Sequence, residues 1–161
     1  MILAMLFLGV GMAASVSGRY RILVAVHRPL GIAVLVLAGV RLINRLLQSP
    51  PPLPDSVSPI QQVAARASHV LLYALMFIMP LLGWGMLSAA PTPIVLFGSL
   101  RLPPILPQDP ALYAVLRQLH TDCAYLLLAV FLVHLGAALL HGLIRRDGVF
   151  ESMALWGRRR G

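Results

Sequence analysis

Four long apolar stretches, separated by polar and proline-rich segments, make up most of this sequence. They cover residues 1–16, 22–47, 67–88 and 112–144, each boundary being approximate. A helix rises about 1.5 Å per residue, so about 20 apolar residues cross the hydrocarbon core of a bilayer. The pattern predicts an all-α fold, a transmembrane four-helix bundle that occupies residues 1–161 as a single domain and leaves no room for a soluble one.

The first stretch, residues 1–16, is short for a complete span and is apolar from Met1 onward. A signal peptide carries a basic segment before its apolar core, and no such segment precedes this core. We therefore expect a transmembrane helix whose beginning lies upstream of the printed start.

Prolines occur inside the third apolar stretch and in the segment that follows it, and they predict different structures in the two places. Pro80 lies inside that stretch, where a transmembrane helix tolerates proline as a kink rather than a break. Residues 89–111 contain six prolines and predict an irregular apolar loop at the membrane interface. Near the C-terminus, residues 150–161 predict a short interfacial helix that Trp156 anchors.

The composition agrees with a membrane protein. Hydrophobic residues make up 59% of the chain and charged residues 11%, against about 25% charged residues in soluble domains, and the mean hydropathy is +0.86. The net charge of +8 comes from arginines that flank the apolar stretches, so it indicates membrane topology rather than nucleic-acid binding. The single cysteine, Cys123, excludes an internal disulfide and an iron–sulfur cluster.

The arginines divide into two groups, and the larger group predicts the cytoplasmic side by the positive-inside rule. This rule places both termini in the cytoplasm. The cytoplasmic group contains Arg41, Arg45, Arg66, Arg145, Arg146, Arg158, Arg159 and Arg160, and the outer group contains Arg19, Arg21, Arg28, Arg101 and Arg117.

All five histidines fall within the bounds of the predicted spans, and three of them, His27, His120 and His134, lie away from the cytoplasmic ends. An ionisable side chain inside a span indicates a functional site. His27 and His120 lie in the first few turns of two helices that start on the same side of the membrane. The two side chains can therefore meet at a similar depth in the bilayer. His134 follows His120 by 14 residues, about 21 Å further along nearly the same helix face. Paired histidines on two helices suit axial haem ligation, and Gly31 would leave space beside His27.

Other histidine chemistry stays open at this point. A proton relay or a transition-metal transporter also places histidines in the membrane. Transporters of divalent metals usually need carboxylates inside the membrane, and no acidic residue lies in the middle of a predicted span. The acidic residues are Asp55, Asp109, Asp122, Asp147 and Glu151.

Several motifs together resemble the bacterial cytochrome b561 family over nearly the whole chain. One motif runs from His27-x-x-x-Gly31 to Arg41-Leu-x-x-Arg45 and a proline-rich loop. The others are His69 before a helix with Pro-Leu-Leu-Gly at 80–83, the Phe97-Gly98 loop, His120, and His134-x6-His141.

The resemblance implies a four-helix inner-membrane protein with two b haems. By position, His27 and His120 would bind the outer haem, and His134 would bind the inner one. The second inner ligand should be a histidine at the start of the first helix. The sequence has none there, so either its start is truncated, which the short first stretch favours, or this member has lost the ligand and the inner haem is five-coordinate or absent. We do not expect His69 to substitute for it, since an interfacial position or a place near a haem propionate explains His69 equally well.

Two further residues have roles implied by the same resemblance. His141 would lie near a quinone on the cytoplasmic side, with a simple interfacial position as the alternative. Arg41 is a topology determinant that would also pair with a haem propionate.

The function implied is electron transfer from the periplasmic side of the bacterial inner membrane to ubiquinone. Superoxide is one candidate donor, because the outer arginines would steer an anion, and the activity would then be that of a superoxide:quinone oxidoreductase. The same arginines also suit lipid headgroups. A partner dehydrogenase or hydrogenase, served by this chain as a cytochrome anchor subunit, is the alternative donor.

Overall fold

The computed structural model describes residues 1–16, 18–48, 58–98 and 100–147. Its elements follow the order α1 (Ile2–Ala13), α2 (Gly18–Leu47), α3 (Pro59–Ala89), β1 (Ile94–Phe97), β2 (Leu100–Leu102) and α4 (Pro110–Leu139), and a π-helix, Leu140–Arg145, continues α4. The expected interfacial helix at 150–161 lies outside the described residues.

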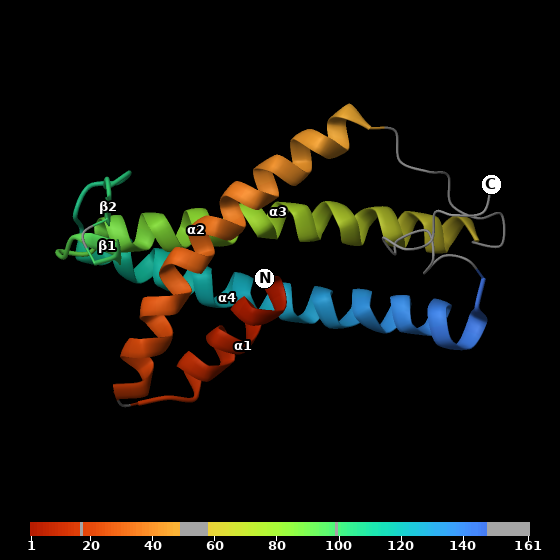
Figure 1. The fold of residues 1–161 in the computed structure, drawn as a ribbon, viewed down its shortest axis with the longest axis horizontal. Helices are drawn as coiled ribbons and strands as arrows, with labels where there is room; N and C mark the ends of the chain where they lie inside the picture. Colours follow the sequence, from red (N-terminus) through yellow and green to blue (C-terminus); the bar gives the residue numbers. More distant parts are fainter. Residues whose placement is uncertain (17, 49–57, 99, 148–161) are drawn as a thin grey trace.

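The helix pair α3 and α4 forms the centre of the molecule (Figure 1). These two helices lie antiparallel and side by side, and α2 crosses them obliquely while packing on α3. The short helix α1 packs on α2 and also touches α4. The end of α3, the start of α4 and the β-hairpin share one end of the molecule, which we call the outer end, and the opposite end is the inner end.

Three described helices are long and apolar enough to cross a membrane: α2, α3, and α4 with its π-helical continuation. The prediction of a helical membrane protein is therefore confirmed. The described α1 has 12 residues, which is about 18 Å of helix against about 30 Å of hydrocarbon. A bundle of four complete spans stays a prediction.

The helices start earlier than hydropathy predicts because local caps, not apolar residues, fix their first turns. In α3, Ser58 and Gln61 form a reciprocal capping box, and Pro59 occupies the first turn. In α4, Asp109 caps the amides of residues 111 and 112. Helix α3 also continues through Pro80 without a break.

The irregular loop expected at 89–111 is wrong in part, because the segment contains an antiparallel β-hairpin. Ile94 pairs with Leu102 and Phe97 with Leu100. The turn uses Gly98 at a φ of +49°, a left-handed conformation that glycine adopts without a Cβ penalty. The sequence did not reveal the strands, because β1 is uniformly apolar, β2 has only three residues, and the surrounding prolines indicated a loop.

Side-chain hydrogen bonds attach the segment after the hairpin to α3. Trp84 Nε1 donates to the carbonyl of Pro103 at 2.9 Å. The Ser88 hydroxyl donates to the carbonyl of Trp84 and accepts from the amide of Ile105 at 3.1 Å. These bonds hold the segment that follows the hairpin against α3.

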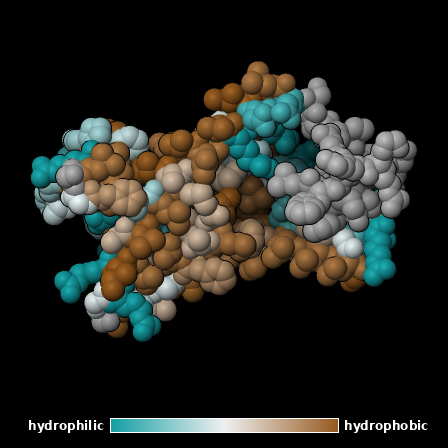
Figure 2. Space-filling view, viewed as in Figure 1, coloured by the Kyte–Doolittle hydropathy of each residue, from teal (hydrophilic) through white to brown (hydrophobic). Residues whose placement is uncertain are grey.

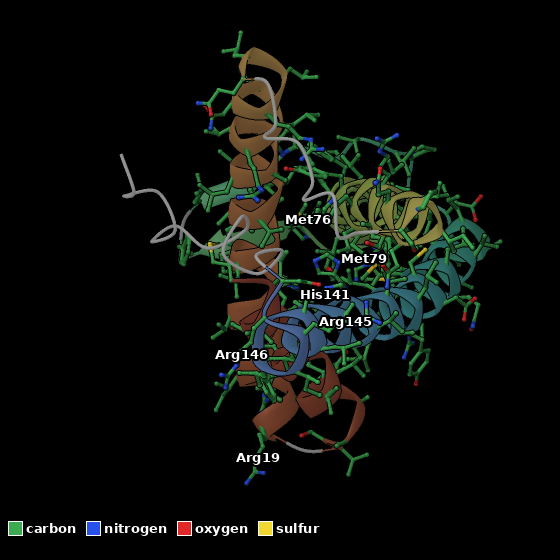
Figure 3. All side chains as sticks on the ribbon, turned by 90° about the vertical axis from the view of Figure 1, so that its right-hand side faces the viewer. Arg19, Met76, Met79, His141, Arg145 and Arg146 are labelled. Atoms are coloured by element: carbon green, nitrogen blue, oxygen red, sulfur yellow. The ribbon has the colours of Figure 1, made fainter. Side chains whose placement is uncertain are left out.

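Large apolar side chains face outward along the middle of the molecule. Phe7 is 76% exposed and Val133 is 73% exposed, and Figure 2 shows hydrophobic surface between hydrophilic ends. Surface of this kind is suited to lipid rather than water. Met76 and Met79 lie on the sides of α3 that face the other helices (Figure 3), as expected of methionines used for packing.

Candidate functional site

At the outer end, the rings of His27 on α2 and His120 on α4 lie close together. Their centroids are 6.2 Å apart and their planes meet at 73°. Both side chains are half-buried, on the helix faces that turn toward one another. The two helices both start at this end, which brings the two histidines to the same depth.

Three buried nitrogens in this region have no protein partner among the described residues: Nδ1 of His27, Nδ1 of His120 and Nε of Arg28. A buried polar atom without a partner costs about 1–3 kcal/mol. Two of these nitrogens belong to the facing rings of His27 and His120, so the ring pair has room for hydrogen bonds or ligation to a group from outside the protein.

Gly83 on α3 lies against the ring of His120. A Cβ added to Gly83 would stand 3.3 Å from Cε1 and 3.6 Å from Nδ1 of that ring. The ring therefore packs on the backbone of α3, and this contact fixes one side of it. Gly83 was not among the predicted site residues, although it ends the Pro-Leu-Leu-Gly motif.

At the inner end, the ring of His134 on α4 meets the ring of His69 on α3. The centroids are 5.1 Å apart and the planes meet at 60°, an edge-to-face arrangement. The hydroxyl of Ser68 lies 3.2 Å from Nδ1 of His134. The sequence left the role of His69 open and assigned none to Ser68, because the residues around them do not reveal which part of α4 packs against this turn of α3.

The two ends of the α3–α4 pair share one register. His69 and Gly83 are separated by 14 residues on α3, and His120 and His134 are separated by 14 residues on α4. Because the helices are antiparallel, this spacing brings His69 to His134 and Gly83 to His120. Once the Gly83–His120 contact is known, the equal spacing accounts for the contact between His69 and His134.

Arg41 and Arg45 of α2 both contact Tyr73, one turn beyond His69 on α3. Arg41 Nε donates to the Tyr73 hydroxyl at 3.1 Å, and the Arg45 guanidinium lies 5.5 Å from the Tyr73 ring centroid. The two cations are held on the inner half of α3. The pairing of Arg41 with a haem propionate stays a prediction.

Gly31 lies on the side of α2 that faces α1. A Cβ added there would stand 3.7 Å from Cε of Met5, an ordinary van der Waals distance. Its role in leaving room beside His27 stays a prediction.

His141 occupies the π-helix at the inner end of α4 (Figure 3). Its Nδ1 lies 2.6 Å from Oδ2 of Asp147, and both side chains are largely buried. Six residues along an α-helix correspond to about 600°, which would place the two on different faces. The π-turn and the left-handed residue Arg146, at a φ of 51°, bring Asp147 back to His141.

No group of three or more histidine, cysteine or acidic side chains clusters for metal binding in residues 1–16, 18–48, 58–98 and 100–147.

The sequence matches the family profile described as prokaryotic cytochrome b561 over residues 1–156. This chain belongs to that family. The match confirms the resemblance read from the motifs and identifies the chain as a membrane electron-transfer protein of a haem b family.

Three curated relatives agree with this placement. Cytochrome b561 homolog 2 of Escherichia coli K12 is 31% identical over 138 residues, 85% of this chain and 73% of the relative. Cytochrome b561 homolog 1 of the same organism is 27% identical, over 85% of this chain and 77% of the relative. The probable superoxide oxidase CybB of Yersinia pestis is 29% identical, over 80% and 72%.

The outer histidine pair of this cytochrome b561 has the spacing that haem b requires. With about 2.0 Å from metal to imidazole nitrogen and about 1.1 Å from nitrogen to ring centre, two axial imidazoles have centres roughly 6.3 Å apart. The His27–His120 distance of 6.2 Å matches this value. The His69–His134 distance of 5.1 Å is about 1 Å too short for the two rings to share an iron.

Proposed function

We propose that this cytochrome b561 carries electrons from superoxide, at the outer side of the bacterial inner membrane, to ubiquinone at the cytoplasmic side. Two superoxide ions give two molecules of O₂ and two electrons, which reduce ubiquinone to ubiquinol with two protons from the inner side. The observation that carries the proposal is the His27–His120 pair at 6.2 Å, with a buried unpartnered nitrogen on each ring.

In this proposal His27 and His120 hold the outer haem from two helices, and His134 is a ligand of the inner haem. Haem b supplies one-electron redox chemistry at its iron. Helix α4 contributes to both sites and sets their separation at about 21 Å along its axis. Gly83 supports the His120 ring by its close contact, which keeps that ring from turning away.

The outer arginines support superoxide as the donor. Arg101 lies on β2, Arg19 and Arg21 lie in the first turn of α2, and Arg117 lies in the second turn of α4. In the proposed topology all four face the outer side, where positive charge raises the local concentration of a small anion. The relative named as a probable superoxide oxidase points the same way.

The His141–Asp147 pair supports reduction of ubiquinone at the inner end. Asp147 accepts a hydrogen bond from Nδ1 of His141, which orients the imidazole. An imidazole held in this way is suited to donate a hydrogen bond or pass a proton to a quinone carbonyl. Arg145 and Arg146 beside it keep this end positively charged.

Optical spectra and haem counts on the purified full-length protein in nanodiscs test the haem assignment. We expect Soret and α bands typical of reduced b haem, loss of one haem per chain in His27→Ala and in His120→Ala, and no loss in the matched control His141→Ala. Absence of these bands, or full haem content in both outer variants, would contradict the assignment.

The donor and acceptor are tested by stopped-flow mixing with superoxide and a ubiquinone analogue. We expect the haem bands to be reduced by superoxide and reoxidised by the quinone. If superoxide leaves the haem oxidised while an added reductant reduces it, the donor is a partner protein instead.

A further inference from the structure

His134 is held from one side by two consecutive residues of α3. The Ser68 hydroxyl lies 3.2 Å from its Nδ1, and the His69 ring meets it edge-to-face. Both contacts come from the face of α3 that packs on α4. The His134 ring therefore has little freedom to rotate.

The two hydrogen bonds of the Ser68 hydroxyl bear on which ring nitrogen of His134 carries the hydrogen. The Ser68 hydroxyl lies 3.0 Å from the carbonyl of Ala65, one turn earlier, and donates to it. A serine hydroxyl has one proton and two lone pairs, and bonding back to such a carbonyl is common for serine within a helix. The shorter contact to Ala65, 3.0 Å against 3.2 Å to Nδ1 of His134, favours a Ser68 proton directed at Ala65. In that arrangement the Ser68 oxygen accepts from His134, and Nδ1 of His134 carries the hydrogen.

A neutral imidazole with hydrogen on Nδ1 has its lone pair on Nε2. That lone pair is what a metal binds. Histidine ligands generally donate their other ring N–H to a fixed acceptor, which sets the tautomer and raises the basicity of the ligand.

We propose that Ser68 is a positioning residue for the inner site: it accepts from Nδ1–H of His134 and thereby presents Nε2 as the haem ligand. This inference rests on the proposed function, in which His134 binds the inner haem. Its content is separate, because it concerns the orientation, tautomer and basicity of the ligand and not its identity.

The test uses the full-length protein with haem bound, in nanodiscs, and follows the potentiometric titration of the haem bands and the ferric electron paramagnetic resonance spectrum. His134→Ala identifies the inner redox step as the one that it removes. Ser68→Ala then removes the acceptor, and alanine is a good helix former, so folding is preserved.

We expect Ser68→Ala to raise the midpoint potential of the inner step, because a less basic imidazole stabilises ferric iron less. A tenfold change in the reduction equilibrium, about 59 mV for one electron, is the expected scale. The inner ferric resonance should shift as well, while the outer step stays unchanged.

Two control variants separate positioning from general packing. Ser68→Thr keeps a hydroxyl that can bond the preceding turn and should restore the potential. Thr121→Ala removes a hydroxyl that donates to the carbonyl of Arg117 on α4 and should leave the inner step at its wild-type potential.

The experiment distinguishes failure of the Ser68 inference from failure of the His134 ligand assignment. If His134→Ala removes the inner step but Ser68→Ala leaves its potential and resonance unchanged, Ser68 has no positioning role while the proposed function stands. If His134→Ala leaves both redox steps in place, the ligand assignment fails, and this inference fails with it.

Discussion

Gly83 on α3 and His120 on α4 are in close contact, since a Cβ at Gly83 would stand 3.3 Å from Cε1 of the His120 ring. A distance of 3.3 Å is shorter than nine in ten of the contacts that Cβ atoms make, so a side chain at Gly83 would require the His120 ring to shift. The backbone of α3 is therefore one wall of the outer histidine pair, although α3 contributes no histidine to it.

Substitution of Gly83 should damage the outer site. Gly83→Leu is expected to displace the His120 ring, at a cost of about 1–3 kcal/mol for overpacking, and to lower haem content toward one per chain. Haem quantification on purified protein measures this. Gly39→Leu on α2 is the matched control, because a Cβ there has no neighbour within 4 Å, and equal losses in both variants would contradict the role of Gly83.

Arg28 should tune the outer redox step. Its Nε is buried without a protein partner next to His27, so its charge is poorly screened. Arg28→Gln is expected to lower the outer midpoint potential, because removal of a nearby positive charge favours the ferric state. Potentiometric titration reads the shift. Arg101→Gln, on exposed β2, should change the potential little because solvent screens it.

His69 should not be an inner haem ligand. Its ring lies 5.1 Å from that of His134, a separation about 1 Å too short for both to bind one iron. We expect His69→Ala to keep the haem content of the wild type, whereas His134→Ala loses one haem. A haem loss in His69→Ala equal to that in His134→Ala would show that His69 binds the iron after a rearrangement.

Asp147 should matter for quinone reduction and not for haem reduction. Asp147→Asn removes the carboxylate that contacts Nδ1 of His141 at 2.6 Å, and with it the acceptor that orients the imidazole. Quinone reduction by prereduced protein is expected to slow by roughly 10²-fold, the lower end for loss of an acid–base group. Stopped-flow spectra should show wild-type haem reduction in the same variant, and slowed reduction there would argue for misfolding.

The sequence predicts the membrane helices well because apolar length is a local property. It places the first turns of the helices less well, above all in α3. Ser58 and Asp109 cap the backbone amides of those turns, and both lie in polar segments that a hydropathy criterion leaves outside the helix. The contact between Ser68 and His134 is harder still to predict from the sequence. It depends on which face of α3 meets α4, and that register is set by packing along both helices together.

The equal spacing of 14 residues on α3 and α4 limits how this protein can change in length. One residue inserted between His120 and His134 would rotate the lower part of α4 by about 100° and advance it by about 1.5 Å. His134 would then leave Ser68 while His120 kept its place on Gly83. Insertions and deletions between the two levels are therefore excluded unless both helices change together, whereas single substitutions can adjust each redox step separately.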